Sequence, residues 1–356
     1  MKRAKHLDKA VWTLLAAGSS ALFVGCGEPD RPAELVIWHG AKQRVGHLGD
    51  AQDDFNLMGV VNGNEFTYSV NNGQRAPLEV SFEPFGFRRR GAAGHFNANI
   101  PISSLKAGEN LIDIFAEGSN REMSGRIHLN RATEGESPLP MTIDWTEIAH
   151  PQDVGQIVDG LWAIEDAGLR SETPLYDRLF LLGNRTWTDY RISSSITIHG
   201  VPDENGPKSG GSGLGFILRF AGHSVSEPRF PDAQPKWGYQ PFGGICWLRW
   251  EKGQPSIDPT RQFYRGDRDE FQDAGPLSGF ELEKTYGITA ECETSQTDPT
   301  TTIYRLRVWP AELEEPEGWD FQVEQTSDAA LRKGGVALVA HHVDVTFGGV
   351  NVTALP

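Results

Sequence analysis

The sequence predicts an all-β protein, and three observations lead to this class. Short apolar runs that alternate in period two recur along the chain, and no helix-period segment of comparable length competes with them. Turn formers are frequent, with 40 Gly and 22 Pro in 356 residues. Aromatic residues amount to 10%, which is too many for a disordered chain and is typical of packed strands. At ~100–200 residues per domain, the length predicts two folded units.

The overall charge excludes one class of partner. The formal net charge is -15 and the isoelectric point is near 5.1. Nucleic-acid binding depends on clustered Lys and Arg that release counterions from phosphates, so no nucleic-acid partner is expected.

The first element is a targeting segment. A basic start precedes the apolar run Val11–Gly25, which is shorter than the ~20 residues of a spanning helix and ends at Cys26. Residues 22–26 resemble the lipobox of bacterial lipoproteins. The resemblance implies that residues 1–25 are a signal peptide and that Cys26 is lipidated. It also implies a location in the bacterial cell envelope, facing the periplasm or the exterior, with the membrane reached through this lipid only. The alternative is an ordinary signal peptide followed by a chance cysteine.

A polar, Pro-containing tether completes residues 26–33, and the next element is a first sandwich over residues 34–131. Seven short β-type runs lie in this range, and Asn71-Asn72-Gly73 supplies a turn that tolerates positive φ. The pattern L-x-x-G-x-N-x-I-x-I-x-A over 105–116 resembles immunoglobulin-like domains of bacterial surface proteins. Residues 132–140 are polar, carry two prolines and predict a linker.

The last element, residues 141–356, alternates in period two almost throughout, which predicts a second all-β unit. Its order of motifs resembles the concanavalin A-like lectin and glucanase superfamily, which includes laminin-G-like and keto-disaccharide hydrolase-like domains. The resemblance is carried by W-x-D-Y-x-I over 187–192, G-x-G-x-x-x-R over 213–219, and the closing strands at 335–338 and 345–352. It implies a two-sheet jelly roll.

The catalytic motifs of this superfamily are missing from the sequence. Laminarinase-like enzymes carry an E-x-D-x-x-E run, and the lyases carry R-x-E-L-R or Q-I-H strings; none of these occurs here. Carbohydrate binding is therefore the leading function, with a polysaccharide or glycan as partner. A glycoside hydrolase or lyase acting on a polysaccharide, and a structural or adhesion module without a small ligand, are the alternatives. Aromatic residues around paired carboxylates would favour the enzyme, and a filled concave face would favour the structural role.

Candidate binding residues centre on the strand 215–220. Its alternation sends Phe216, Leu218 and Phe220 to the core and Arg219 to the opposite, concave face, where a guanidinium can bind sugar hydroxyls or a uronate carboxylate. Other aromatic and polar residues are expected to join Arg219 in the binding site: His223, Trp237, Tyr239, Trp247, Arg249 and His342. Trp247 and Trp250 lie three residues apart on one predicted strand, so one of them must face inward.

Two further expectations concern cysteines and metal. Cys246 and Cys292 lie in predicted strands, where they either form a disulfide or remain as two buried thiols. The sequence establishes no cofactor, and Asp344 is the candidate ligand should the protein bind Ca²⁺, which prefers oxygen ligands.

Overall fold

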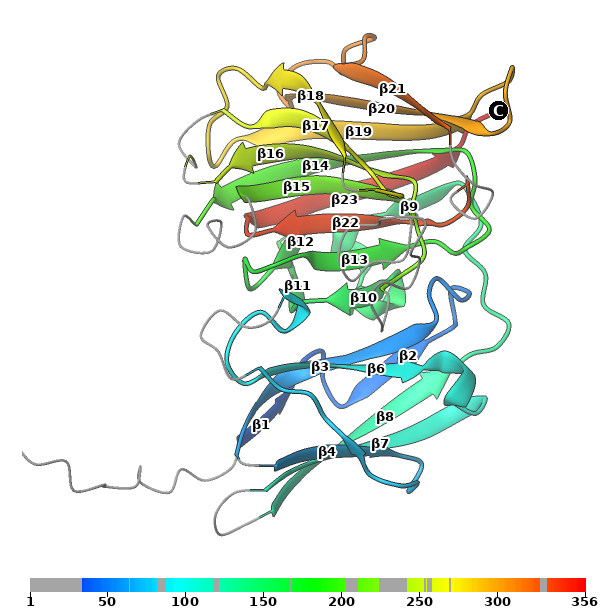
Figure 1. Cartoon of the computed structure of the whole chain (residues 1–356), viewed down its shortest axis with the longest axis vertical. Helices are drawn as coiled ribbons and strands as arrows, with labels where there is room; N and C mark the ends of the chain where they lie inside the picture. The colour runs from blue at the N-terminus through cyan, green and yellow to red at the C-terminus, as the bar shows by residue number, and fades with distance from the viewer. Residues whose placement is uncertain are drawn as a thin grey trace, which may run out of the picture.

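The computed structural model describes residues 34–63, 65–81, 88–117, 122–166, 168–202, 211–223, 242–252, 254, 258–268, 270–326 and 332–356, without the side chains of 88, 122 and 123. These residues form strands joined by turns and by single turns of 3-10 helix, so the predicted all-β class is confirmed (Figure 1). Within the same ranges, no helix is long and apolar enough to cross a membrane.

The N-terminal unit is a sandwich of two sheets. One sheet has the order β1-β3-β6 and the other has the order β2-β8-β7-β4-β5. Their bounds are β1 Glu34–Ile37, β2 Lys42–Val45, β3 Asp54–Asn62, β4 Glu65–Val70, β5 Ala76–Pro77, β6 His95–Pro101, β7 Gly108–Glu117 and β8 Glu122–Arg131. Phe55, Leu57, Ile112 and Ile127 fill the core between them. Asn71 and Asn72 adopt the predicted positive φ, at 53° and 58°. The immunoglobulin-like family stays a prediction.

The C-terminal unit is the predicted two-sheet jelly roll. A seven-stranded sheet has the order β10-β13-β22-β15-β16-β17-β18, and an eight-stranded sheet has the order β11-β12-β23-β14-β19-β20-β21, with β9 paired to β23. Their bounds are β9 Met141–Ile143, β10 Gln156–Asp159, β11 Trp162–Glu165, β12 Gly168–Ser171, β13 Arg178–Leu182, β14 Tyr190–Gly200, β15 Gly211–Phe220, β16 Gly244–Glu251, β17 Thr260–Arg265, β18 Phe271–Pro276, β19 Thr285–Thr294, β20 Thr301–Pro310, β21 Phe321–Thr326, β22 Gly335–His341 and β23 Asp344–Ala354.

The main core lies between these two sheets. Phe216 and Leu218 of β15 point into it, as predicted, and meet side chains of the eight-stranded sheet such as Ile192. Cys246 and Cys292 are both buried there as free thiols, so the disulfide alternative is wrong. Burial raises the pKa of both thiols, which keeps them protonated and unreactive.

The outer face of the seven-stranded sheet is covered. Ile217, Phe220, Ile245 and Val339 form a second apolar cluster there, together with Ala51 of the N-terminal unit. All ten residues of β15 are buried, as expected for a strand that is covered on both faces. The middle of this face is thus filled.

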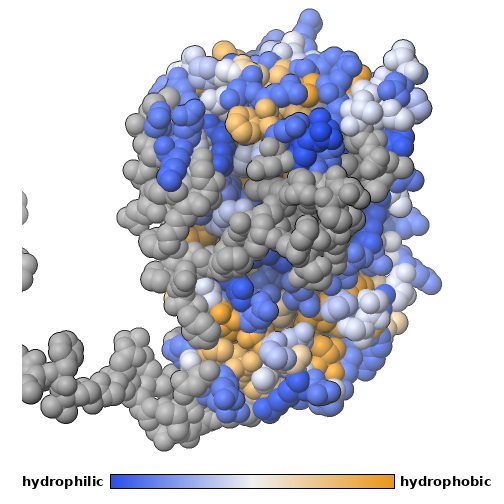
Figure 2. All heavy atoms as spheres, in the orientation of Figure 1, coloured by the Kyte–Doolittle hydropathy of each residue, from blue (hydrophilic) through white to orange (hydrophobic). Residues whose placement is uncertain are grey.

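The two units also meet near β10, which lies beside β3 and β6 in Figure 1. Trp38 and Met58 of the N-terminal unit pack with the main core of the C-terminal unit. Figure 2 shows that the visible face of the N-terminal unit carries a group of hydrophobic residues, whereas the visible surface at the far end of the C-terminal sandwich is mostly hydrophilic.

Candidate functional site

Arg219 does not face outward, and that prediction is wrong. Arg219 forms a bulge between Leu218 and Phe220, with φ at 55°, so the alternation of β15 is shifted from this residue on. The backbone N–H of Arg219 donates to the hydroxyl of Tyr190, at 2.7 Å, from the opposite sheet. The bulge therefore sends the Arg219 side chain into the sandwich and turns Phe220 outward.

The guanidinium of Arg219 is fully buried and occupied by protein groups. It donates to Asp189 Oδ1 at 2.9 Å, to Thr302 Oγ1 at 2.7 Å and to the Thr188 carbonyl at 3.1 Å. Arg219 is part of the scaffold, where it ties β15 to the eight-stranded sheet.

Trp247 and Arg249, by contrast, lie on the outer face of the seven-stranded sheet, while Trp250 is in the main core. The Arg249 guanidinium carbon is 4.8 Å from the centre of the Trp247 ring. Trp247 Nε1 donates to Gln262 Oε1 at 2.9 Å, and Gln262 Nε2 donates to Asp273 Oδ1 at 2.8 Å. These bonds fix the tryptophan ring and so fix the surface on which the guanidinium stacks.

A glycine makes room for this arrangement. Gly213 of β15 lies in register between His341 of β22 and Arg249 of β16. A Cβ at Gly213 would lie 2.8 Å from a ring carbon of Trp247, so only glycine allows the ring to lie flat on the strand.

Two histidines and an acid complete the group. His341 Nδ1 is 2.6 Å from Asp177 Oδ1, and the His341 ring lies 6.2 Å from that of Trp247 and 4.5 Å from that of His342. Tyr176 meets both histidines edge-on, with ring centres 4.8 and 6.0 Å away. We define the histidine cluster by six residues: Tyr176, Asp177, Trp247, Arg249, His341 and His342.

Sequence reasoning found three of these six residues and missed the others. Tyr176 and Asp177 precede β13, about 70 residues before Trp247 in the chain, and only the pairing of β13 with β22 brings them to His341. The single signal in the sequence is a polar Tyr-Asp-Arg group directly before the apolar run of β13.

Most of the histidine cluster is buried, but two of its residues are partly exposed. Asp177, Trp247, His341 and His342 are buried, whereas Tyr176 and Arg249 are only partly buried. Burial lowers the pKa of Arg249, although Asp177 and Tyr176 act in the opposite direction. A guanidinium remains charged in any case.

His342 is the unusual member of the cluster. It is 6% exposed, and both of its ring nitrogens are buried without a hydrogen-bond partner. Its φ is 53°, which is uncommon for a non-glycine residue, and its backbone N–H donates to the Leu175 carbonyl at 2.9 Å. Burial first, and then the neighbouring His341, lower its pKa to about 2, so the ring is neutral at physiological pH. A neutral imidazole offers one donor and one acceptor, and leaving both unsatisfied costs stability.

His223 belongs to a different network, at the junction of the two units. The fully buried Asp159 accepts from Arg89 Nε at 2.8 Å and from Asn97 Nδ2 at 2.6 Å, and its other oxygen pairs with His223 Nε2. His223 therefore lies in the domain junction rather than in the histidine cluster. Trp237 and Tyr239 lie outside the described residues.

Asp344 forms a salt bridge with an arginine of the protein itself. Arg170 donates to both of its carboxylate oxygens, each at 2.9 Å. This corrects the expectation that Asp344 binds Ca²⁺, because a guanidinium holds the positions that a cation would take. Among the residues that the structure describes, no group of three or more His, Cys, Asp or Glu is arranged to hold a metal ion.

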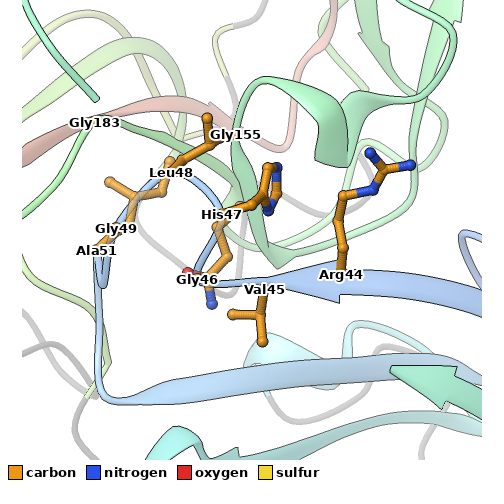
Figure 3. Close-up of a pocket in the computed structure, with 11 residues that line it drawn as sticks. Arg44, Val45, Gly46, His47, Leu48, Gly49, Ala51, Gly155 and Gly183 are labelled. Atoms are coloured by element: carbon orange, nitrogen blue, oxygen red, sulfur yellow. The ribbon is translucent and has the colours of Figure 1, made fainter. Parts of the chain in front are cut away.

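Two cavities lie elsewhere, beside β2. One is small, with a volume of about 20 Å³, which is room for a single water molecule, and it is lined by the turn at residues 46–49 and by Gly155 and Gly183 (Figure 3). The other is an open depression of about 620 Å³, lined by Lys42, Arg44, His128 and other polar residues. His47 lines both. Arg44 pairs with Asp153 and His128 pairs with Glu109, so most of the charge in the depression is already neutralised.

No family model matches this chain, and no curated protein matches it. Among solved structures, the exoplasmic/lumenal domain of VIP36 in its Ca2+/Man3GlcNAc-bound form aligns with 11% identity and a TM-score of 0.34, over 57% of this chain and 83% of that domain. The marine PL-14 alginate lyase from Aplysia kurodai aligns with 13% identity and a TM-score of 0.31, over 58% and 88%. A bifunctional GH43-CE protein from Bacteroides eggerthii aligns with 10% identity and a TM-score of 0.38, over 85% and 47%. Similarity at this level does not identify a ligand or an activity for this chain.

Proposed function

We propose that the protein binds a glycan at the histidine cluster. The observation that carries this proposal is His342, a neutral, buried imidazole with no partner for either ring nitrogen, beside the partly exposed Arg249. A sugar hydroxyl both donates and accepts, so it satisfies such a ring. A fixed aromatic ring with polar side chains around it is also the usual composition of a sugar site.

The filled middle of the outer face favours the structural alternative for that part of the sheet, and it limits the size of a binding site. Because Ile217, Ile245 and Val339 are buried under other parts of the chain, we expect a ligand to reach the described part of this face at the partly exposed Tyr176 and Arg249. We therefore expect the site to hold a few sugar units near Tyr176 and Arg249 rather than a long stretch of polysaccharide along the sheet.

The test is a comparison of His342→Asn with the native protein on a panel of glycans. Asn tolerates a positive φ, and the imidazole it removes has no hydrogen bond to lose, so we expect the free energy of unfolding to change by about 1 kcal/mol or less. Loss of the hydrogen bonds to the sugar is expected to weaken binding about tenfold.

A matched control is His199→Asn. His199 lies on the eight-stranded sheet, where its ring nitrogens contact Glu283 and Thr346. This variant is expected to bind like the native protein. Binding by His342→Asn at native affinity would contradict the proposal, and a native protein that binds no glycan would favour the structural alternative.

Catalysis is the second candidate, because the Asp177–His341 pair has the form of an oriented general acid or base. The 2.6 Å contact holds one nitrogen of the His341 ring, and the ring lies beside those of Tyr176, Trp247 and His342. Mass spectrometry of any bound oligosaccharide after incubation tests this candidate. Cleavage that disappears in Asp177→Asn would support a hydrolase or lyase, and an intact glycan would support binding alone.

We further propose that Cys26 carries the lipid that holds the protein in the bacterial cell envelope. The support is the apolar run that ends at this residue. Cys26→Ser should abolish incorporation of labelled fatty acid, since the thioether needs that sulfur. Label in the mutant would contradict lipidation at Cys26 and leave glycan binding unaffected.

A further inference from the structure

We infer that the N-terminal unit positions the glycan site: Arg89 of that unit holds Arg178, and Arg178 holds the segment 175–177, which brings Tyr176 and Asp177 to the histidine cluster. Arg178 is thus a positioning residue that joins the cluster to the junction of the two units. The inference rests on the proposed function for its ligand, and it adds that the affinity for this ligand depends on the junction.

The segment 175–177 meets the two histidines of the cluster through three successive residues. The Leu175 carbonyl accepts from the backbone N–H of His342 at 2.9 Å, and Asp177 Oδ1 lies 2.6 Å from His341 Nδ1. Between them, the Tyr176 ring meets both histidine rings edge-on. The φ of Asp177 is 40°, a conformation that a non-glycine residue keeps only where its surroundings hold it. Displacement of the segment would therefore change all three contacts together.

Arg178 holds the backbone of this segment. Its guanidinium is fully buried, and both Nε, at 3.0 Å, and Nη2 donate to the Tyr176 carbonyl. Nη2 also donates to the Arg89 carbonyl at 3.1 Å. The Asp159 carboxylate attracts Arg178 as well, since Arg178 is one of the cations that hold the pKa of Asp159 below its usual range. One buried guanidinium thus joins the backbone next to Asp177 to a carbonyl of the N-terminal unit and to the carboxylate at the junction.

Arg89 fixes the carbonyl to which Arg178 donates. It lies in the single 3-10 turn at residues 88–90, and its own side chain anchors that turn to strands of both units. Nε donates to Asp159 Oδ1 of β10 at 2.8 Å, and Nη1 donates to Asn99 Oδ1 of β6 at 3.0 Å. The junction between β6 and β10 therefore sets the position of the Arg89 carbonyl.

The N-terminal unit also touches the segment directly. A Cβ at Gly91 would lie 2.7 Å from Leu175 Cδ1, so the backbone that follows Arg89 packs against the Leu175 side chain. The segment is thus supported from the N-terminal unit both through Arg178 and by this contact. Because a binding site needs its side chains held to within about 0.5 Å, loss of this support should lower the affinity for a ligand.

The first experiment observes the histidine cluster without a ligand. In protein with isotope-labelled histidine, the nuclear magnetic resonance signals of the His341 and His342 rings depend on the distance and tilt of the Tyr176 ring beside them. The variants His341→Gln and His342→Asn assign these signals. Arg89→Gln removes the charged bond to Asp159, so the segment should move and the signals of both rings should shift.

Two controls remove an arginine elsewhere. Arg44 also crosses the junction, where it pairs with Asp153 at 3.0 Å. Arg219 is a fully buried arginine of the main sandwich, near the end of β15 opposite to Gly213, which pairs with His341. Arg44→Gln and Arg219→Gln should leave the histidine signals at their native positions, although Arg219→Gln lowers the stability of the fold.

The second experiment measures the affinity for glycans. The probes are cellotetraose, laminaritetraose, mannotetraose and xylotetraose, and calorimetry gives the Kd of each. For a tetraose that the native protein binds, we expect Arg89→Gln to bind about tenfold more weakly and the two controls to bind like the native protein. Arg178→Met should lose at least as much affinity. Arg178→Lys should recover part of it, because it retains a cation that donates to a carbonyl.

The outcomes distinguish this inference from the proposed function. Native histidine signals and native affinity in folded Arg89→Gln would overturn the inference and leave glycan binding intact. Shifts of the same size in Arg219→Gln would also overturn it, because the signals would then follow stability rather than the position of the segment. A native protein that binds none of the four tetraoses would count against the proposed function, and the histidine signals would then decide the positioning alone. Arg89→Gln and Arg178→Met disturb the same contacts independently, so if one fails to fold, the other decides.

Discussion

The two sheets of the C-terminal sandwich differ in their outer faces. On the eight-stranded sheet, β14 alternates between buried and partly exposed residues, and its outer side chains bond to those of β19, as in Ser193 with Thr289 and Thr197 with Thr285, both at 2.9 Å. On the seven-stranded sheet, every residue of β15 is buried. Regular polar alternation therefore marks the solvated face, and its loss marks a sheet that is covered on both sides.

The comparison also explains why the histidine cluster stands out. Polar groups on the eight-stranded sheet pair with one another, as the buried Glu291 does with Arg191 and Arg305, and the Arg191 side chain is 42% exposed to water. Polar groups on a covered face have no water, so each needs a specific partner. His342 lacks one among the described residues, and this points to a ligand more strongly than a polar residue on the other sheet would.

The largest expected effect comes from a comparison of Ile217→Asp with Thr197→Asp, which tests whether the two outer faces differ in their access to water. Ile217 is fully buried on the covered face, so an unpaired carboxylate there should cost more than about 4 kcal/mol of unfolding free energy, or prevent folding. Thr197 lies on the solvated face, where the same charge should change stability by about 0.5 kcal/mol or less. Urea denaturation measures both, and losses of similar size would show that the two faces are alike.

A comparison of Arg219→Ala with Arg191→Ala tests the difference between an arginine that points into the sandwich and one that lies on the outer face. Because Arg219 is fully buried, its removal takes the charged partner from Asp189, which Thr294 still holds, and takes a donor from Thr188 and Thr302, so we expect a loss of about 3 kcal/mol. Arg191 is 42% exposed, so its loss should cost about 1 kcal/mol or less. A stable Arg219→Ala that binds ligand poorly would return Arg219 to the binding site.

Asp159→Asn tests how the N-terminal unit covers the seven-stranded sheet. We expect a loss of about 2 kcal/mol at neutral pH, because Arg89 and His223 would lose a charged partner. Burial alone would raise the pKa of Asp159, but Arg89 and His223 outweigh it and hold the pKa below its usual range.

The stabilisation by Asp159 is consequently present above the unfolded pKa of about 3.9 and is lost as the pH falls through the folded pKa. The gap in unfolding free energy between the native protein and Asp159→Asn should narrow in acid. A gap that is constant from neutral pH to about pH 3 would contradict this assignment.

The smallest expected effect is that of Arg191→Gln on the solvated face. Arg191 pairs with Glu291, which Arg305 also holds at 3.0 Å, so the variant should lose about 0.5 kcal/mol, and less in high salt. A loss above about 2 kcal/mol in thermal unfolding would mean that this face is not screened by solvent.

The sequence by itself determined the strands, their turns and the side chains of the main core. The alternation that places Phe216 and Leu218 inward, and the positive φ of Asn71 and Asn72, depend on a residue and its near neighbours, so they can be recognised locally. The same reasoning predicted that one of Trp247 and Trp250 faces inward, and the structure shows that it is Trp250. Alternation alone does not reveal what covers a face, and for that reason the filled outer face of β15 was not expected.

Only the tertiary structure decided the position of Arg219 and the composition of the histidine cluster. The bulge at Arg219 depends on a hydroxyl from Tyr190 in the opposite sheet, and Tyr176 and Asp177 reach His341 only through the pairing of β13 with β22. These contacts join residues that are far apart in the chain, and period-two patterns carry no information about them. The period of a strand is a local property, whereas the partner that satisfies a buried polar group is chosen by the packing of the whole fold.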